Sequence, residues 1–133
     1  MFAELFVALY VAHMLGDYVF QTDHQADHKA DPGVAGWWVN LNHAGTHVAV
    51  SIFALIAVRL VTDIPLDTQA AGAGLLWIGA THGFIDRRWP VLWWMNRTGS
   101  PEFATKGGAA FVDQALHITA LGIAALAMTA LSA

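Results

Sequence analysis

The chain contains no cysteine among its 133 residues, and it contains few charged side chains. The absence of cysteine excludes disulfide bonds, thiolate metal sites, iron–sulfur centres and cysteine nucleophiles. Charged residues make up 12% of the sequence, about half of the roughly 25% that is usual in soluble domains. Six lysines and arginines stand against ten acidic residues, so no basic surface indicates nucleic acid as a partner.

Hydrophobic residues, in contrast, make up 56% of the sequence, and the mean hydropathy is +0.49. Four segments have the length and composition of membrane-spanning helices, for which about 20 residues suffice. These segments are 2–22, 37–62, 69–89 and 108–131. The sequence therefore predicts an all-α, four-helix transmembrane bundle that forms a single domain over 1–133. A soluble four-helix bundle is the alternative, because each segment also contains ionisable residues.

The distribution of positive charge predicts the orientation of this bundle. With four spans, the loops 23–36 and 90–107 lie on the same side, which carries every lysine and arginine except Arg59. Such residues favour the cytoplasmic side, so we expect these loops in the cytoplasm and both termini outside it, in a bacterial or host inner membrane. Because Glu4 stands where a signal peptide has basic residues, we also expect the first helix to be retained.

Every predicted helix carries two histidine or aspartate side chains separated by four positions, a spacing that places both on one face. The pairs are His13–Asp17, His43–His47, His82–Asp86 and Asp113–His117. Since consecutive helices run in opposite directions, all four pairs fall in the half of the bundle nearer the cytoplasmic loops. The four histidines His13, His47, His82 and His117 form a deeper layer, and the other four residues form a shallower one.

Ionisable side chains in hydrocarbon are costly, at about 2.5 kcal/mol or more for aspartate, so eight of them at one depth indicate a site. Imidazole and carboxylate groups together suit zinc, iron, manganese or nickel, and paired ligands on four helices also build di-metal bundles. We therefore expect these eight residues to bind one or two divalent transition-metal ions, with zinc the first candidate. Candidates for contacts with the ligands or with a substrate are Gln21, Asn40, Arg87, Arg88 and Gln114.

Four short motifs contain these pairs. They are H-x-x-G-D-Y-x-x-Q at 13–21, H-x-x-x-H at 43–47, H-x-x-I-D at 82–86 and D-Q-x-x-H at 113–117. Together they resemble a family of small bacterial and phage integral membrane proteins that is grouped as a domain of unknown function. The resemblance implies membrane residence and a shared polar cluster, but no activity. More loosely, the pattern is similar to small inner-membrane metal-dependent hydrolases.

The leading functional hypothesis is a metal-dependent hydrolase that acts on an amphiphilic or lipid-linked substrate at the cytoplasmic side, among membrane lipids. Asp113 or Asp17 would be the general base, and Arg87 or Arg88 would hold an anionic group. The sequence does not decide whether the protein is an enzyme. A transporter or channel for a divalent metal or protons is the first alternative, and it would need a homo-oligomer to enclose a pathway. The others are a structural polar network and a haem held by two histidines.

Overall fold

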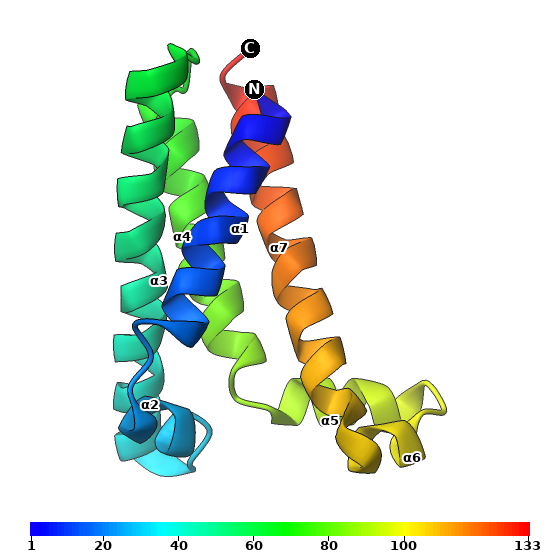
Figure 1. Cartoon of the computed structure of the whole chain (residues 1–133). Coiled ribbons are helices and arrows are strands. Elements are labelled where there is room, and N and C mark those ends of the chain that lie inside the picture. The colour runs from blue at the N-terminus through cyan, green and yellow to red at the C-terminus, as the bar shows by residue number, and fades with distance from the viewer.

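The computed structural model describes all residues 1–133, and it contains helices but no strand. Four long helices lie side by side along one axis (Figure 1): α1 (Phe2–Tyr18), α3 (Gly33–Thr62), α4 (Thr68–Ile85) and α7 (Ala109–Leu131). They pack in the cyclic order α1, α3, α4, α7, so that each helix contacts two neighbours. Both termini lie at one end of the bundle, and three short helices lie at the other: α2 (Asp23–His28), α5 (Trp89–Arg97) and α6 (Pro101–Phe103). The predicted all-α architecture with four long helices is confirmed.

The first helix ends four residues earlier than expected, at Tyr18. The cause is the cap of the next helix, because Thr22 and Gln25 form a reciprocal capping box at the start of α2. The Thr22 hydroxyl accepts from the Gln25 amide at 3.2 Å, and the Thr22 amide donates to the Gln25 side chain at 3.0 Å. These bonds satisfy donors that a helix N-terminus leaves free, so the polar run after Phe20 forms a separate short helix.

The third long helix also ends earlier than expected, at Ile85 rather than at 89. Arg88 has a positive φ of 61°, and the amide of Trp89 donates to the carbonyl of Arg87 at 2.6 Å. This is a γ-turn with positive φ, which is rare for a residue with a side chain. The turn reverses the chain. Pro90 lies in the first turn of α5, where the backbone N–H that proline lacks would have no partner within the helix.

The link from α5 to α7 contains α6 and one π-helical turn (η1, Ala104–Gly108), which is interrupted at Lys106 and Gly107. Gly107 has φ 93°, a conformation that glycine adopts without steric cost. The resulting kink separates the link from α7, which begins at Ala109 and so agrees within one residue with the expected start at 108.

The interior divides into an apolar half and a polar half. Near the termini, the core consists of ten buried apolar residues, among them Leu5, Leu9, Leu55, Leu121 and Met128. Nearer α2 and α5, the buried side chains are largely polar or charged. These are His13, Asp17, Asn40, His43, His47, Ser51, His82, Asp86, Arg87 and His117. The ionisable residues are therefore concentrated at one end of the bundle interior, as the sequence predicted.

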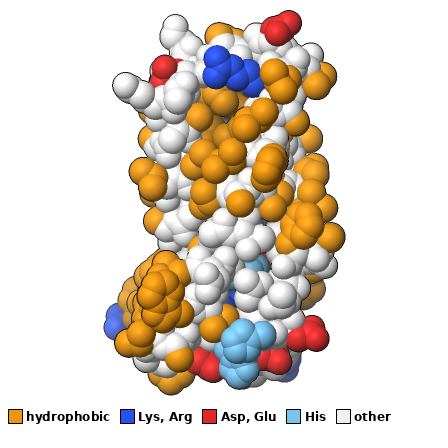
Figure 2. Space-filling model, turned by 90° about the vertical axis from the view of Figure 1, so that its left-hand side faces the viewer, with side chains coloured by type: hydrophobic (Ala, Val, Ile, Leu, Met, Phe, Trp, Pro, Cys, Tyr) orange, Lys and Arg blue, Asp and Glu red, His pale blue; other side chains and the backbone are white.

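The outer surface of the bundle is strongly apolar. Two stretches, Gly33–Thr62 and Pro101–Leu131, are long and apolar enough to cross a membrane, with mean hydropathies of 1.9 and 1.6. Large apolar side chains such as Val7, Phe53 and Leu76 are more than half exposed. Figure 2 shows apolar side chains spread over the middle of the bundle, with the charged side chains of this face mostly near its two ends.

Candidate metal centre

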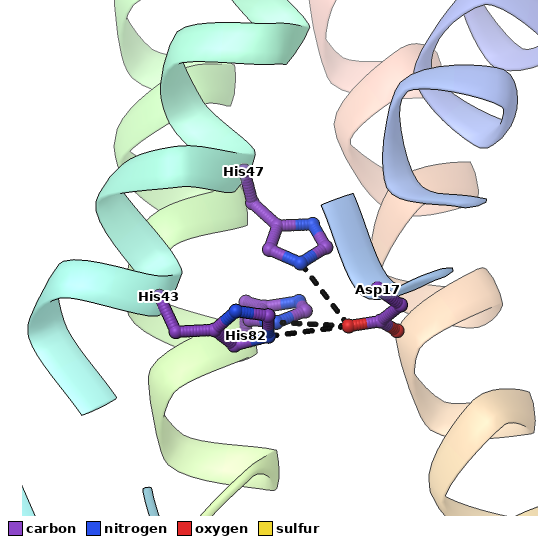
Figure 3. Close-up of side chains that lie close together, drawn as sticks. All are labelled: Asp17, His43, His47 and His82. Carbon is purple, nitrogen blue, oxygen red and sulfur yellow. Dashed lines mark hydrogen bonds and ion pairs between the residues drawn. The ribbon is translucent and has the colours of Figure 1, made fainter. Parts of the chain in front are cut away.

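Asp17 lies at the centre of a cluster to which three helices contribute. Its Oδ1 atom is 3.1 Å from His47 Nε2, 3.2 Å from His43 Nε2 and 3.8 Å from His82 Nε2 (Figure 3). All four side chains are buried. Two ligands of a tetrahedral zinc ion, each at about 2.0–2.1 Å from the metal, lie roughly 3.3 Å apart. The distances from Asp17 Oδ1 to the nitrogens of His43 and His47 are therefore close to those between two ligands of one ion, and the four residues could hold a metal ion.

A second group of possible ligands adjoins the first one through Asp86. Its Oδ2 atom is 3.1 Å from His82 Nε2 and 3.3 Å from His43 Nε2. On the other side, His117 Nε2 is 3.5 Å from Asp86 Oδ1 and 3.5 Å from Asp113 Oδ2. Asp86 directly follows α4 and is 4% exposed, whereas the Asp113 side chain on α7 is 23% exposed. The two groups share the space between α3, α4 and α7, and Asp113 is their most accessible member.

His13 joins the cluster through Gln114. The Nε2 atom of His13 lies 3.2 Å from Asp17 Oδ2 and 3.2 Å from Gln114 Oε1. The amide nitrogen of Gln114 donates to the same Asp17 oxygen at 3.2 Å. Gln114 thus contacts both His13 and Asp17 from α7.

The imidazole rings of the expected deeper layer pack directly on one another. The ring of His82 has its centroid 3.6 Å from that of His47, 4.3 Å from that of His117 and 5.5 Å from that of His13. His13, His82 and His117 form a third group that could hold an ion. The structure brings all eight predicted ligands into one continuous cluster.

Hydrogen bonding alone does not satisfy the atoms of this cluster. His43 Nε2 lies 3.2 Å from Lys29 Nζ, which can only donate, and 3.2 Å from an oxygen of Asp17, which can only accept when ionised. No single protonation state of this nitrogen suits both neighbours. In addition, His82 Nε2 and His117 Nε2 are buried without a hydrogen-bond partner, although each lies within 3.5 Å of an oxygen of Asp86. Buried lone pairs of this kind are satisfied either by a donor such as the Lys29 ammonium group, 3.0 Å from Asp86 Oδ2, or by a bound cation.

Gly16 allows α1 and α3 to approach at the level of the cluster. A Cβ atom at this position would overlap the buried ring of His47. Glycine is therefore required here so that His47 can reach Asp17 on the neighbouring helix.

The other predicted polar residues lie around the cluster in different roles. Asn40 is fully buried, and neither side-chain atom has a hydrogen-bond partner. Gln21 donates to the backbone carbonyl of Asp17 at 3.1 Å and lines a cavity beside the cluster. Arg87 is buried, packs over the ring of Trp37 and donates to backbone carbonyls of the segment between α2 and α3. Arg88 is exposed and lines the same cavity as Gln21.

Lys29 is a member of this site that sequence reasoning missed. Its Nζ atom is 3.0 Å from Asp86 Oδ2 and 3.2 Å from His43 Nε2, and its side chain is 12% exposed. In the sequence it contributes only to the positive charge of a loop. No periodicity signals its position, because it lies at the end of the short helix α2, outside the four long helices.

The exposed acidic and histidine residues of α2 remain separate from the cluster. The His28 side chain contacts Asp31 at 2.8 Å, and both are about half exposed. The His24 and His28 rings lie 4.8 Å apart. They form an exposed polar surface.

A comparison with known families identifies one family of unknown function. Residues 5–133 match the family described as "Protein of unknown function (DUF3307)". No curated protein and no solved structure matches the chain. Because the match extends over nearly the whole sequence, the chain belongs to the DUF3307 family of proteins of unknown function.

Proposed function

We propose that the protein is an integral membrane metal-binding protein whose centre catalyses metal-dependent hydrolysis of an amphiphilic or lipid-linked substrate. The apolar outer surface supports membrane insertion, since large exposed apolar side chains occur on all four long helices. At about 1.5 Å per residue, even the shortest, α1 with 17 residues, spans roughly 26 Å, close to the ~30 Å of a hydrocarbon core. The centre would then lie near the cytoplasmic headgroups.

The observation that carries the metal proposal is the contact of one aspartate oxygen with three imidazole nitrogens at 3.1–3.8 Å. Three histidines and one carboxylate are a ligand set that zinc accepts in tetrahedral geometry, and iron, manganese or nickel also bind such ligands. All four of these residues belong to one chain, so the proposed site does not need a second copy of the protein. Zinc is therefore our first candidate for the bound ion.

A divalent ion at such a centre polarises a scissile group and lowers the pKa of its water to about 7. The residues of the chain then divide into two roles. Asp17, buried among three histidines, is placed to hold the ion, whereas Asp113 contacts only His117 in the cluster and lines the adjoining cavity. Asp113 is thus the carboxylate that is free to accept a proton from attacking water as a general base.

The division of the interior favours hydrolysis over transport. Between the cluster and the end that carries the termini, the bundle is filled by buried apolar side chains, among them Leu5, Leu9 and Met128. An ion or proton that crosses a membrane needs polar groups or water along its path. Polar groups at one end and a packed apolar core at the other suit a site that is approached from one side.

The packing of the imidazole rings argues against haem. A haem held by two histidines needs the porphyrin ring between the two imidazoles. The rings of the deeper layer lie 3.6–5.5 Å apart, which leaves no room for a porphyrin between them.

The hydrolase proposal predicts that Asp113→Asn lowers the rate of hydrolysis by about 10²–10⁴-fold, the usual contribution of a general base, without loss of metal. The rate is measured with zinc-loaded protein in detergent on p-nitrophenyl esters of phosphate and of hexanoic acid. Glu102→Gln, an exposed carboxylate outside the cluster, is the matched control and should retain the wild-type rate. The proposal fails if zinc-loaded wild type hydrolyses neither ester faster than chelator-treated protein.

A further inference from the structure

A cavity of about 450 Å³ opens directly beside the candidate metal centre. It lies between α2, α5 and the start of α7, and we refer to it as the α2–α5 cavity. Its wall combines two carboxylates and two cations with apolar side chains. The residues that matter here are Lys29, Arg88, Asp86, Asp113, Val91 and Leu92. Its volume falls within the roughly 300–1,000 Å³ that small-molecule sites occupy.

Lys29 places a fixed positive charge between this cavity and the metal ligands. Its ammonium group contacts Asp86 and His43, and its backbone carbonyl accepts a hydrogen bond from Arg87 at 2.9 Å. The Arg87 side chain, in the turn that follows α4, therefore holds the backbone of Lys29 in place. Arg87 itself does not line the cavity.

Arg88 supplies the second charge, and the backbone is strained to place it there. Its positive φ within the γ-turn is of the kind that costs roughly 1–3 kcal/mol and is kept where surrounding structure requires it. The turn separates two consecutive arginines, so that Arg87 is buried while Arg88 lines the cavity. Arg88 donates one hydrogen bond, at 3.1 Å to the carbonyl of Ala26, which leaves guanidinium donors for a ligand.

We propose that the α2–α5 cavity binds the phosphate group of a phosphorylated amphiphile between Lys29 and Arg88, with the apolar part of the ligand along Val91 and Leu92. This assignment rests on the proposed function and names its substrate class. A guanidinium and an ammonium group facing one cavity match the oxygens of a phosphate. A neutral amide or glycoside would leave the remaining donors of the Arg88 guanidinium group without an anionic partner.

The two carboxylates of the cavity make this binding depend on metal. Asp86 and Asp113 would repel an anion unless a divalent ion in the adjoining centre compensates their charge. Phosphate should therefore bind to the zinc-loaded protein and not to the chelator-treated one.

The test is isothermal titration calorimetry of the full chain, purified in detergent and loaded with zinc. The ligands are inorganic phosphate, glycerol 3-phosphate and dihexanoyl phosphatidic acid, with uncharged dihexanoylglycerol for comparison. We expect the phosphatidic acid to bind more tightly than inorganic phosphate. Lys29→Met and Arg88→Met should each weaken its binding by about tenfold or more, the worth of one charge-assisted hydrogen bond. Arg97→Met and Lys106→Met, which remove cations outside the cavity, should leave its affinity unchanged.

The outcomes separate this inference from the proposed function. If the zinc content is intact but Arg88→Met binds phosphatidic acid as tightly as wild type, the phosphate assignment is overturned and the metal centre stands. Equal affinity for inorganic phosphate and phosphatidic acid would overturn the amphiphilic part. A wild-type protein that binds no metal would overturn the proposed function itself. Arg88 contacts none of the candidate ligands, so this variant remains informative even if Lys29→Met loses zinc.

Discussion

Replacing Asp17 with asparagine is expected to reduce zinc affinity by about 100-fold or more, because even residues that only orient ligands contribute about 10–100-fold. Asp17 is the one carboxylate in contact with four histidines, through His13, His43, His47 and His82. Asparagine preserves the shape of the side chain but removes its negative charge and one of its acceptor atoms. The change therefore tests the charge and not the packing.

Competition with a zinc-binding dye, carried out on wild type and variant in the same detergent, measures this loss. Asp27→Asn is the matched control, since it removes an exposed aspartate of α2 and should leave the affinity unchanged. If Asp17→Asn bound zinc as tightly as wild type, the cluster around Asp17 would not be the metal site.

Removal of the metal is expected to lower thermal stability strongly. An ion that binds only the folded state stabilises it by about 2.7 kcal/mol at a concentration one hundred times its Kd. In a chain of this size that corresponds to a shift in Tm of roughly 10 °C. Without a metal ion, the ring nitrogens of His82 and His117 remain buried without a hydrogen-bond partner, which adds to the effect.

The shift is measured by thermal unfolding in detergent before and after chelation, and again after zinc is restored. Magnesium should not replace zinc, because it prefers oxygen ligands in octahedral geometry. Asp17→Asn should show little difference between the chelated and the zinc-containing sample. Identical melting of chelated and reloaded wild type would mean that the buried network is stable by itself.

The sequence predicts the long helices and the cluster because both depend on helical periodicity. A spacing of four residues places His43 and His47 on one face of their helix, and His82 and Asp86 on one face of theirs. This holds however the helices pack against one another. Alternating helix directions then bring the pairs to one depth, which the contacts between His82 and residues of the other three long helices confirm.

The parts that sequence reasoning missed arise from turns, where periodicity gives no guidance. Lys29 reaches the cluster only because a capping box at Thr22 starts a short helix that returns over the end of the bundle. Arg88 lines the cavity because it adopts a positive φ itself. An arginine in the sequence gives no reason to expect that backbone conformation. The sequence likewise does not distinguish the roles of Arg87 and Arg88, because they are two consecutive arginines.

The central claim is that residues from separate helices hold one metal ion, and elemental analysis of detergent-purified protein tests it most directly. Wild type should contain zinc or another divalent transition metal in a stoichiometric ratio to the chain. His43→Ala on α3 and His82→Ala on α4 should both lose it, because each contacts the same Asp17 oxygen. His24→Ala, on the exposed face of α2, should retain it. Wild-type protein without stoichiometric metal, or full retention of metal in both variants, would contradict the account.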